Sequence, residues 1–326
     1  MKYLTVLAAS VASLSLATAA AAQELKFASF VPPFHTVTAS LIDKLSAGVS
    51  DATGGDLTVR NYPGGELGAG PVEQYVRVVQ GAADFAWGLP GYTSSQFQKT
   101  MIVELPGAID PDAGGHEALW AAYDEHLAGE FPATKPIALW TSEAQVMIMR
   151  DKIIRTPDDL KGLKIRVAGA TAGEVASALG ATPVQMPISQ VYNSLQTGLI
   201  DGVFTGSSTL SDFKLSEVAS SVTVGAPLGR LSFYAVMNES VYNGLSADKK
   251  AAIDATAGLA LSASAENAWQ ATADAAMAAY GEDSTKTVVM LSDAEIQAFA
   301  DAVSAVTDAY VSSVGGEAAL AAMRGN

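Results

Sequence analysis

The sequence predicts an α/β protein of two lobes, in which helices cover mostly parallel β-sheets. Strand and helix patterns alternate as β-α-β-α-β over residues 25–89, which is the order of a parallel sheet with crossover helices. The chain has 326 residues, enough for two hydrophobic cores. One alanine-rich segment, residues 246–280, has a helical pattern longer than a single lobe.

The first part of the chain contains three expected strands and two expected helices. The strands are residues 25–30, 57–62 and 83–89, and the first two end in loops that contain proline. The helices are residues 36–50, where apolar side chains recur on one stripe, and residues 71–80, which begin at a proline and end before a glycine.

The middle of the chain continues the alternation of helices and strands. The expected elements are a helix at 114–128, strands at 136–140, 146–150 and 163–167, helices at 172–179 and 188–198, and strands at 200–206, 222–224 and 231–237. No proline-rich linker separates two halves, so we expect the chain to cross between the lobes more than once. The expected lobes are residues 23–143 with 232–272, and residues 144–231 with 273–326.

The last part of the chain begins with the long helical segment. Ser246 is suited to cap its first turn, Asp248 lies in that turn, and no proline interrupts residues 246–280. Such a helix would be roughly 50 Å long at 1.5 Å per residue. Its heptads are too weak for a coiled coil, so we expect a helix that bridges both lobes. A strand at residues 286–291 and a helix at residues 292–313 complete the chain.

The segment LKGLKIRVAG, residues 160–169, places a cation at the end of an expected strand. Ile165 and Val167 alternate with Lys164 and Arg166, as in a strand. Arg166 therefore lies near the carboxyl end of a strand, where ligands of open α/β sheets collect. Its guanidinium stays charged and matches a carboxylate in shape. The alternative, which the strand pattern alone favours, is a surface arginine on an edge strand.

The first 22 residues have the pattern of a secretory signal. Lys2 is their only charge, an apolar run follows, and small residues precede an expected cleavage site after Ala22. No later segment is apolar over the length of a membrane span, so we expect no direct membrane insertion. The net charge of −15 argues against nucleic acid as a partner, and the absence of cysteine excludes disulfides and thiolate chemistry.

Motifs for metal, nucleotide and covalent chemistry are missing from the sequence. The three histidines form no HExxH, and neither a cysteine pair nor a clustered acidic loop occurs, so we expect no metal ion or other cofactor. No GxSxG elbow, phosphate-binding GxxxxGK loop or strand-borne GxGxxG occurs either. An enzyme is therefore disfavoured, and a secreted enzyme acting on a small carboxylate is kept as the alternative from another functional class.

Four segments form a combination more specific than any one of them. They are TGGDLTVRNYPGGELG at 53–68, GAADFAW at 81–87, DLKGLKIRV at 159–167 and MPISQVYNSLQTGLIDGV at 186–203. In this order and spacing they resemble the DctP-like solute-binding proteins of tripartite ATP-independent periplasmic (TRAP) transporters, over nearly the whole chain after the signal. The resemblance implies a two-lobe periplasmic binding protein fold with hinge strands and a long lobe-bridging helix.

The resemblance also implies a function in transport. A protein of this family captures an organic carboxylate in the periplasm and delivers it to the TRAP membrane permease subunits, in sodium-coupled uptake and without chemistry of its own. A binding protein of an ATP-driven importer is the nearer alternative, because its cleft would be similar.

Four site residues follow from the family's motifs. The arginine of the KIRV motif, which is the family's carboxylate clamp, is Arg166 here. The family's second contact follows a DG motif on a later strand, often in the context D-G-x-E-x. Here the sequence DGVFT has Phe204 in place of the glutamate and Thr205 at the contact position. Some members place another arginine on the strand that follows residue 140, where Arg150 is the candidate.

The remaining site candidates are mostly aromatic or apolar residues at strand ends. They are Phe34, His35, Trp87, Leu89, Trp140, Ile188, Phe233 and Tyr234. The alternative for each aromatic residue is core packing, and for His35 it is a loop-capping role. Together the candidates predict an apolar pocket with one fixed cation.

This pocket sets an expectation for the ligand class. Each hydroxyl group of a sugar acid that is buried there without a partner would cost about 1–3 kcal/mol. We therefore expect a monocarboxylate with an apolar or aromatic body, such as a 2-oxo or aryl-acetic acid, in preference to a sialic or uronic acid.

Overall fold

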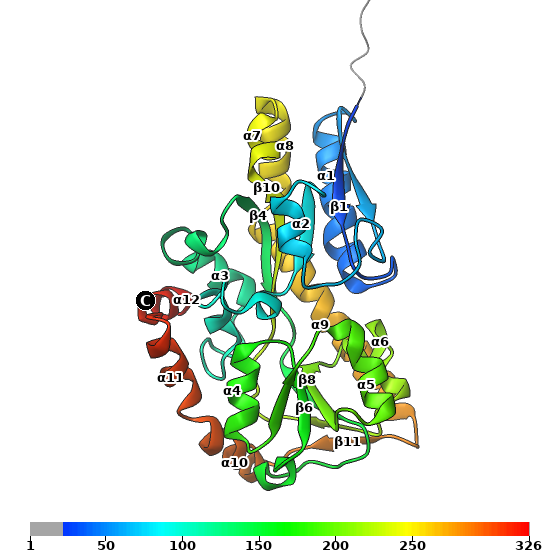
Figure 1. The fold of residues 1–326 in the computed structure, drawn as a ribbon, viewed down its shortest axis with the longest axis vertical. Helices are drawn as coiled ribbons and strands as arrows, with labels where there is room; N and C mark the ends of the chain where they lie inside the picture. Colours follow the sequence, from blue (N-terminus) through cyan, green and yellow to red (C-terminus); the bar gives the residue numbers. More distant parts are fainter. Residues whose placement is uncertain (1–21, 326) are drawn as a thin grey trace, which may run out of the picture.

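The computed structural model describes residues 22–325, which fold around two separate β-sheets (Figure 1). The signal segment predicted for residues 1–22 lies outside the described residues, apart from Ala22. The strand order is β2-β1-β3-β10-β4 in the first sheet and β11-β9-β5-β8-β6-β7 in the second. Each sheet is the centre of one α/β lobe, and strands from distant parts of the sequence lie side by side in both.

The first lobe is built on parallel strands with one antiparallel strand, β10, between β3 and β4. Its strands are β1 (Gln23–Ala28), β2 (Leu57–Tyr62), β3 (Phe85–Gly88), β4 (Thr134–Thr141) and β10 (Ser232–Asn238). Its helices are a π-helical turn (Thr38–Ile42) continued by α1 (Asp43–Ala52), α2 (Gln74–Val79), α3 (Gly115–Ala122), α7 (Glu239–Gly244) and α8 (Ala247–Thr256). β1 is parallel to β2 and β3, whereas β10 is antiparallel to β3 and β4, because it enters this sheet from the second lobe.

The second lobe has a six-stranded mixed sheet. Its strands are β5 (Gln145–Met149), β6 (Lys164–Val167), β7 (Thr182–Gln185), β8 (Gly202–Gly206), β9 (Ser221–Val224) and β11 (Thr287–Met290). Its helices are α4 (Ala170–Ala178), α5 (Val191–Thr197), α6 (Thr209–Asp212) and α10 (Asp293–Val303). β6 is parallel to β7 and β8, so the carboxyl ends of these strands meet at one edge of the sheet.

The C-terminal helices return from the second lobe to the first. After α10 the chain forms α11 (Val306–Ser313) and α12 (Glu317–Met323), and Figure 1 shows α11 leading from α10 up to α12 beside α3. Leu320 and Met323 pack in the core of the first lobe. The predicted assignment of residues 273–326 to the second lobe therefore does not describe α12; the other lobe boundaries stay a prediction.

The long helix is present but shorter than predicted. The segment 246–280 breaks at Gly258, whose φ of +87° lies outside the right-handed helical region, and α9 (Leu259–Glu282) follows with 24 residues, about 36 Å at 1.5 Å per residue. α9 contacts β4 and α3 in the first lobe and α6 and β11 in the second. The bridging role is thus confirmed, and the uninterrupted length is wrong, because a single glycine within a helical pattern gave no sign of a break.

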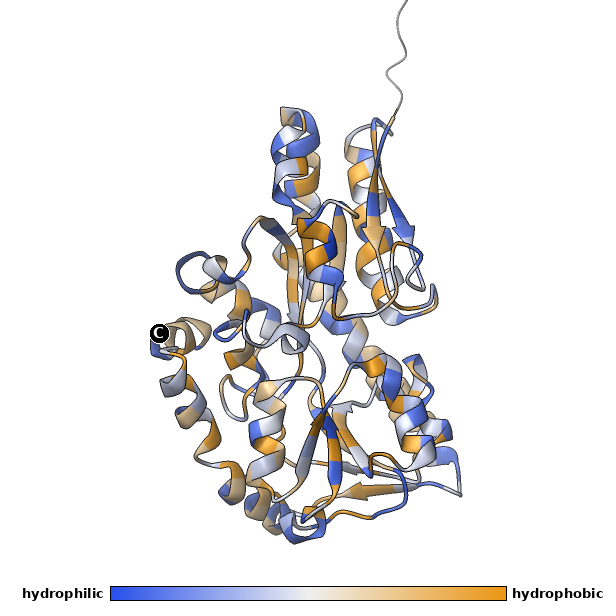
Figure 2. Ribbon diagram, viewed as in Figure 1, coloured by the Kyte–Doolittle hydropathy of each residue, from blue (hydrophilic) through white to orange (hydrophobic). Residues whose placement is uncertain are grey.

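Each sheet has hydrophobic cores on both faces. Figure 2 shows hydrophobic residues concentrated on the strands and on the helix faces turned toward them. The alternation along a strand decides which core a side chain joins: Phe233 and Ala235 of β10 face one core, and Tyr234 and Val236 the other. Within residues 22–325, no helix combines the length and hydropathy needed to cross a membrane.

The strand connections between the lobes run side by side. Ser142, which follows β4, donates its backbone N–H to Leu231 O at 2.8 Å, and Leu231 N–H is donated to Ser142 Oγ at 3.0 Å. Gly229 in the same crossing has a φ of +79°, and a Cβ there would lie 1.8 Å from the Glu104 carbonyl oxygen. These paired segments form the hinge between the lobes.

Candidate functional site

A buried cavity lies between the two lobes, and its wall is largely aromatic. Its free space, counted as the positions open to the centre of a water-sized molecule, is about 40 Å³. The first lobe and α9 contribute Phe30, His35, Trp87, Leu89, Tyr92, Leu231, Phe233 and Trp269. The second lobe contributes Arg166, Ile188, Thr205, Ser208, Thr209, Asp212 and Phe213. Because both lobes supply the wall, the cavity is complete only when they are close together.

Arg166 brings a positive charge into this cavity from β6. Ile165 and Val167 face the core on one side of the sheet, so the strand alternation points Arg166 to the other side, where its residue is 1% exposed. Its Nε donates to the Met186 carbonyl oxygen at 2.9 Å, and its Nη2 donates to the Tyr92 hydroxyl oxygen at 3.4 Å. Burial lowers the pKa of Arg166 from its ordinary value.

The guanidinium has more donors than protein acceptors. Among residues 22–325, no carboxylate lies within 4.0 Å of Arg166, and no acceptor is paired with its Nη1. A buried charge without a counter-ion is unfavourable. The site is therefore suited to receive an anion.

Thr205 lies on the same side of the sheet as Arg166, one strand away. Arg166 is in register with Val203 of β8, and Thr205 follows two residues later, so both side chains point to the cavity. Phe204 lies between Val203 and Thr205 on β8. Its side chain points to the opposite face of the sheet and is fully buried in the core with Ile165.

The aromatic wall is built around Trp87. Its ring stacks on Phe30 with centroids 4.5 Å apart, and its Nε1 donates to Ser29 Oγ at 3.1 Å, which fixes the ring. Phe233 and Trp269 continue the wall, and their ring centroids are 5.2 Å apart. These rings offer flat apolar surfaces to a bound molecule.

A second polar group, around Asp212, faces the same cavity. Asp212 Oδ2 accepts a hydrogen bond from Thr36 Oγ1 at 2.8 Å and lies 3.5 Å from His35 Nε2. His35 Nδ1 accepts the Val37 N–H at 3.1 Å, and burial lowers the pKa of His35 to about 3, so the ring is neutral with its proton on Nε2. The contact between His35 and Asp212 is consequently not an ion pair, and burial raises the pKa of Asp212 to about 6.

Glu143 is buried behind this group, next to the hinge. Its Oε1 accepts the Ser208 N–H at 2.7 Å, whereas its Oε2 has no hydrogen-bond partner in the described part of the chain. Burial raises the pKa of Glu143 to about 7. The carboxyl group of Glu143 is therefore partly protonated near neutral pH.

Tyr92 joins the two lobes at the cavity. Its hydroxyl oxygen accepts the Ile188 N–H at 3.0 Å as well as the Arg166 Nη2–H at 3.4 Å. Beside it, Gln185 Nε2 donates to the Gly91 carbonyl oxygen at 3.1 Å. A Cβ on Gly169 of the second lobe would lie 2.6 Å from the Cα of Gly91, so the backbones of the two lobes meet here.

Seven of the predicted site residues line the cavity. They are His35, Trp87, Leu89, Arg166, Ile188, Thr205 and Phe233. They come from both lobes, and the strand-end positions that suggested them converge as expected for α/β sheets.

The other five predicted residues lie outside the cavity wall, and their assignment is corrected. Phe204 and Tyr234 point to the opposite faces of their strands, because neighbouring residues alternate. Trp140 is fully buried behind Phe233, with centroids 5.3 Å apart.

Phe34 and Arg150 are corrected for a different reason, since both lie at the surface. Phe34 is 69% exposed in the loop after β1, and Phe30 of the same loop takes its place in the wall. Arg150 follows β5 at the end of the sheet where β8 begins, and its Nη1 lies 3.5 Å from Asp151 Oδ2. The cavity is at the other end of β8.

Several lining residues were missed by the sequence-based prediction. They are Phe30, Tyr92, Ser208, Thr209, Asp212, Phe213, Leu231 and Trp269. The alternation along a strand would have separated Phe233 from Tyr234 among the predicted residues. The residues of α6 and α9 carried no such signal, because a helix position faces a site only through its packing.

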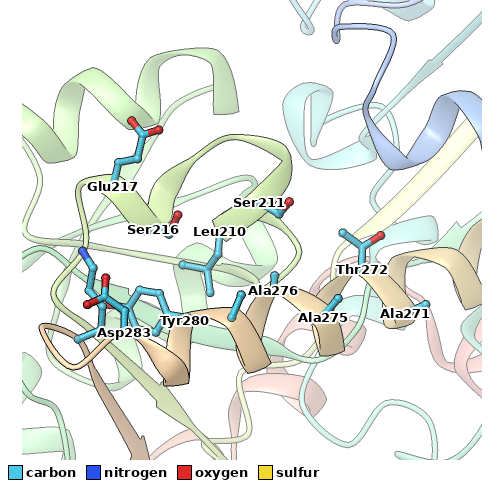
Figure 3. A pocket seen from close by; sticks show the side chains of 12 residues that line it. Leu210, Ser211, Ser216, Glu217, Ala271, Thr272, Ala275, Ala276, Tyr280 and Asp283 are labelled. Carbon is cyan, nitrogen blue, oxygen red and sulfur yellow. The ribbon is translucent and has the colours of Figure 1, made fainter.

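A larger hollow on the surface is a poorer candidate. It lies between α9 and the segment that carries Ser211, Ser216 and Glu217 (Figure 3). It is open to solvent, and its α9 side consists largely of alanines. No group of residues in the range 22–325 is arranged to hold a metal ion. The cavity between the lobes, with its buried cation, is therefore the stronger candidate for the functional site.

Comparison with known proteins identifies the family. Residues 27–313 match the family described as bacterial extracellular solute-binding protein, family 7, also called DctP. The ectoine-binding periplasmic protein TeaA of Halomonas elongata is 26% identical over 268 residues, which cover 80% of this chain and 77% of the relative.

Two solved TRAP solute-binding proteins have the same fold. One, from Bordetella bronchiseptica with bound (R)- and (S)-mandelate, is 28% identical with a TM-score of 0.83, covering 93% of this chain and 98% of that one. Another, from Rhodoferax ferrireducens T118 with copurified benzoate, is 27% identical with a TM-score of 0.84, covering 93% and 96%. These similarities, together with the match over residues 27–313, show that the chain belongs to the bacterial extracellular solute-binding proteins of family 7, the DctP-like binding proteins of TRAP transporters, and is not an enzyme.

Proposed function

We propose that the protein captures a small monocarboxylate with an aromatic or apolar body and delivers it to a TRAP membrane permease. The observation that carries this proposal is the buried guanidinium of Arg166, which faces the cavity with N–H groups that have no acceptor in the described chain. A carboxylate matches that fork and compensates the charge. The aromatic wall then favours a flat apolar body at roughly 25 cal/mol per Å² of buried surface.

The relatives support this ligand class. The similar proteins from B. bronchiseptica and R. ferrireducens hold mandelate and benzoate, which are both aromatic monocarboxylates. TeaA is named for ectoine. Mandelate and benzoate each carry an aromatic ring, and such a ring fits a wall made by Phe30, Trp87 and Trp269.

The proposed mechanism is capture by closure. The acid enters between separated lobes and pairs with Arg166, and Thr205 supplies a hydroxyl beside the carboxylate. Closure about the hinge brings Tyr92 against Arg166 and Ile188 and removes water, which strengthens the ion pair. The closed form is the one that the permease recognises.

The proposal includes the place of action. The signal predicted in residues 1–22 directs export, and the family works in the periplasm, where the permease subunits and sodium-coupled uptake would accept the acid. No nucleic acid, membrane insertion or cofactor is part of the proposal.

A thermal-shift screen with carboxylic acids tests the proposal. A ligand that binds only the folded protein raises its melting temperature, so benzoate, phenylacetate or mandelate should raise it and glucuronate should not. Arg166→Ala should remove the shift, because losing one partner of a buried charged pair costs about 2–5 kcal/mol. Arg150→Ala, at the surface, is the matched control and should keep the shift. A screen in which glucuronate binds most tightly would refute the ligand class, and an unchanged shift in Arg166→Ala would refute the clamp.

A further inference from the structure

The cavity contains an acceptor that the protein leaves unused. Asp212 is 9% exposed, and only its Oδ2 has protein partners, from Thr36 and His35. No hydrogen bond in the described chain reaches Oδ1, and Oδ1 is not among the side-chain atoms sealed from solvent. Since Asp212 lines the cavity, a molecule that fills the cavity lies beside a carboxylate whose Oδ1 has no protein donor in the described chain.

The groups around Asp212 do not compensate its charge. His35 is neutral, because its Nδ1 accepts the Val37 N–H and its ring is buried. Thr36 and Thr272 contribute only hydroxyl groups, whose oxygens are 2.8 Å apart. Arg166 is more than 4.0 Å from Asp212, since the two form no ion pair. A molecule held only by Arg166 would cover this carboxylate and give its Oδ1 no donor.

We propose that the natural ligand carries, besides its carboxylate, a hydrogen-bond donor that Asp212 Oδ1 accepts when the carboxylate lies on Arg166. This inference rests on the proposed function and names the ligand more narrowly. The donor is a hydroxyl or an ammonium group, both of which supply the polar hydrogen that the oxygen lacks. A hydrogen bond to a charged acceptor is stronger than one between neutral groups.

A role for Asp212 only in holding the lobes together does not explain Oδ1. Thr36 lies in the first lobe and Asp212 in the second, so their hydrogen bond does join the lobes. That contact uses Oδ2, and no hydrogen bond in the described chain uses Oδ1 of this cavity-lining residue. The contact at Oδ2 and the proposed contact at Oδ1 can therefore be tested by separate substitutions.

Matched pairs of acids test the proposal by calorimetry. The probes are phenylacetate against 3- and 4-hydroxyphenylacetate, and 4-methylbenzoate against 4-(aminomethyl)benzoate. At least one acid with a donor should bind about tenfold or more tightly than its unsubstituted partner. The hydroxyl and ammonium arms then tell which kind of donor the site takes.

Two variants assign the preference to Oδ1. In Asp212→Asn, Thr36 and His35 still donate toward the position of Oδ2, so the amide oxygen takes that position and the NH₂ group takes the position of Oδ1. An acceptor becomes a donor, and the preference should disappear. Thr36→Val removes the contact to Oδ2 and leaves Oδ1 unchanged, so the preference should persist.

Other outcomes overturn the inference. If both members of every pair bind within twofold of each other, while Arg166→Ala abolishes binding of all of them, the donor is refuted and the carboxylate site stands. A preference that survives Asp212→Asn likewise refutes Asp212 as the acceptor. If no acid binds the native protein, the proposed function fails with it.

Discussion

The position of Arg166 in its strand decides whether its side chain faces the core or the cavity. Its neighbours Ile165 and Val167 are buried in the core, and only the alternation of β6 turns the guanidinium to the cavity. Its Nε is held by the Met186 carbonyl oxygen, so the fork has a fixed orientation. Recognition should therefore depend on the shape of the cation as well as on its charge.

Arg166→Lys tests this dependence on shape. A lysine ammonium is a point charge and cannot make two parallel hydrogen bonds to a carboxylate. We expect affinity for an aromatic acid to fall by at least tenfold, measured by calorimetry, with unchanged thermal stability of the empty protein. A lysine variant with native affinity would show that charge alone suffices.

Glu143 gives the folded protein a pH dependence. Its pKa is raised from 4.5 to about 7, mainly by burial, so the folded state binds a proton that the unfolded state has lost between these values. Folding stability from this group is full below about pH 4.5 and is lost as the pH rises through 7.

The prediction is that the melting temperature falls between pH 5 and pH 7.5. Because Glu143→Gln cannot titrate, it should flatten that fall. The burial of Asp212 raises its pKa to about 6 and adds a slope of the same sign, so the double variant with Asp212→Asn should be flatter still. A melting temperature that rises over this range in the native protein, with no change in the variants, would contradict the assignment.

α9 is the element on which the two lobes depend. Near its first third, Glu266 accepts the N–H groups of Gly115 and His116 at the start of α3, and also the N–H and hydroxyl of Thr141 at the end of β4. Toward its end, Tyr280 donates its hydroxyl to the Ala219 carbonyl oxygen of the second lobe. One helix thus has fixed attachments in both lobes.

Glu266→Gln should be strongly destabilising for a substitution of nearly equal shape. Donors face both carboxylate oxygens, so whichever oxygen becomes NH₂ will oppose N–H groups that are then unpaired. We expect a loss of about 2–4 kcal/mol in the free energy of unfolding, measured with urea. Glu282→Gln, exposed at the end of the same helix, is the control and should change it by less than about 0.5 kcal/mol.

At the scale of the whole molecule, the close approach of Gly91 and Gly169 limits how far the lobes can close. Gly169 has an extended backbone with φ of −156°, which any residue can adopt, so the glycine is not needed for local folding. It is needed for the contact, because a Cβ would lie 2.6 Å from the Cα of Gly91. The steric limit applies only when the lobes meet.

Gly169→Ala should therefore keep the protein partly open. In the native protein, small-angle scattering should give a smaller radius of gyration with saturating benzoate than without ligand. In Gly169→Ala we expect a smaller decrease and a weaker affinity, with little change in stability. Gly173→Ala on α4 has no close neighbour and should behave as the native protein does. Equal decreases in both variants would show that this contact does not limit closure.

The sequence alone determined the features that depend on local pattern and order. The succession of strands and helices predicted two α/β lobes, and the motif around residues 159–167 predicted the family and Arg166, because spacing along the chain is preserved in any fold. The capping box at Thr156 and the glycine end of α5 at Gly198 are likewise set by a few neighbouring residues.

The tertiary structure decided which of the aromatic and polar residues meet. Trp140 and Phe34 are aromatic residues near strand ends, as is typical of a binding site. Trp140 is nevertheless buried behind the cavity wall, and Phe34 is exposed. Asp212 and Trp269 reach the cavity only because α6 and α9 pack against it from distant parts of the chain. Whether such a side chain points to the cavity depends on contacts between elements far apart in sequence. No local sequence pattern encodes those contacts.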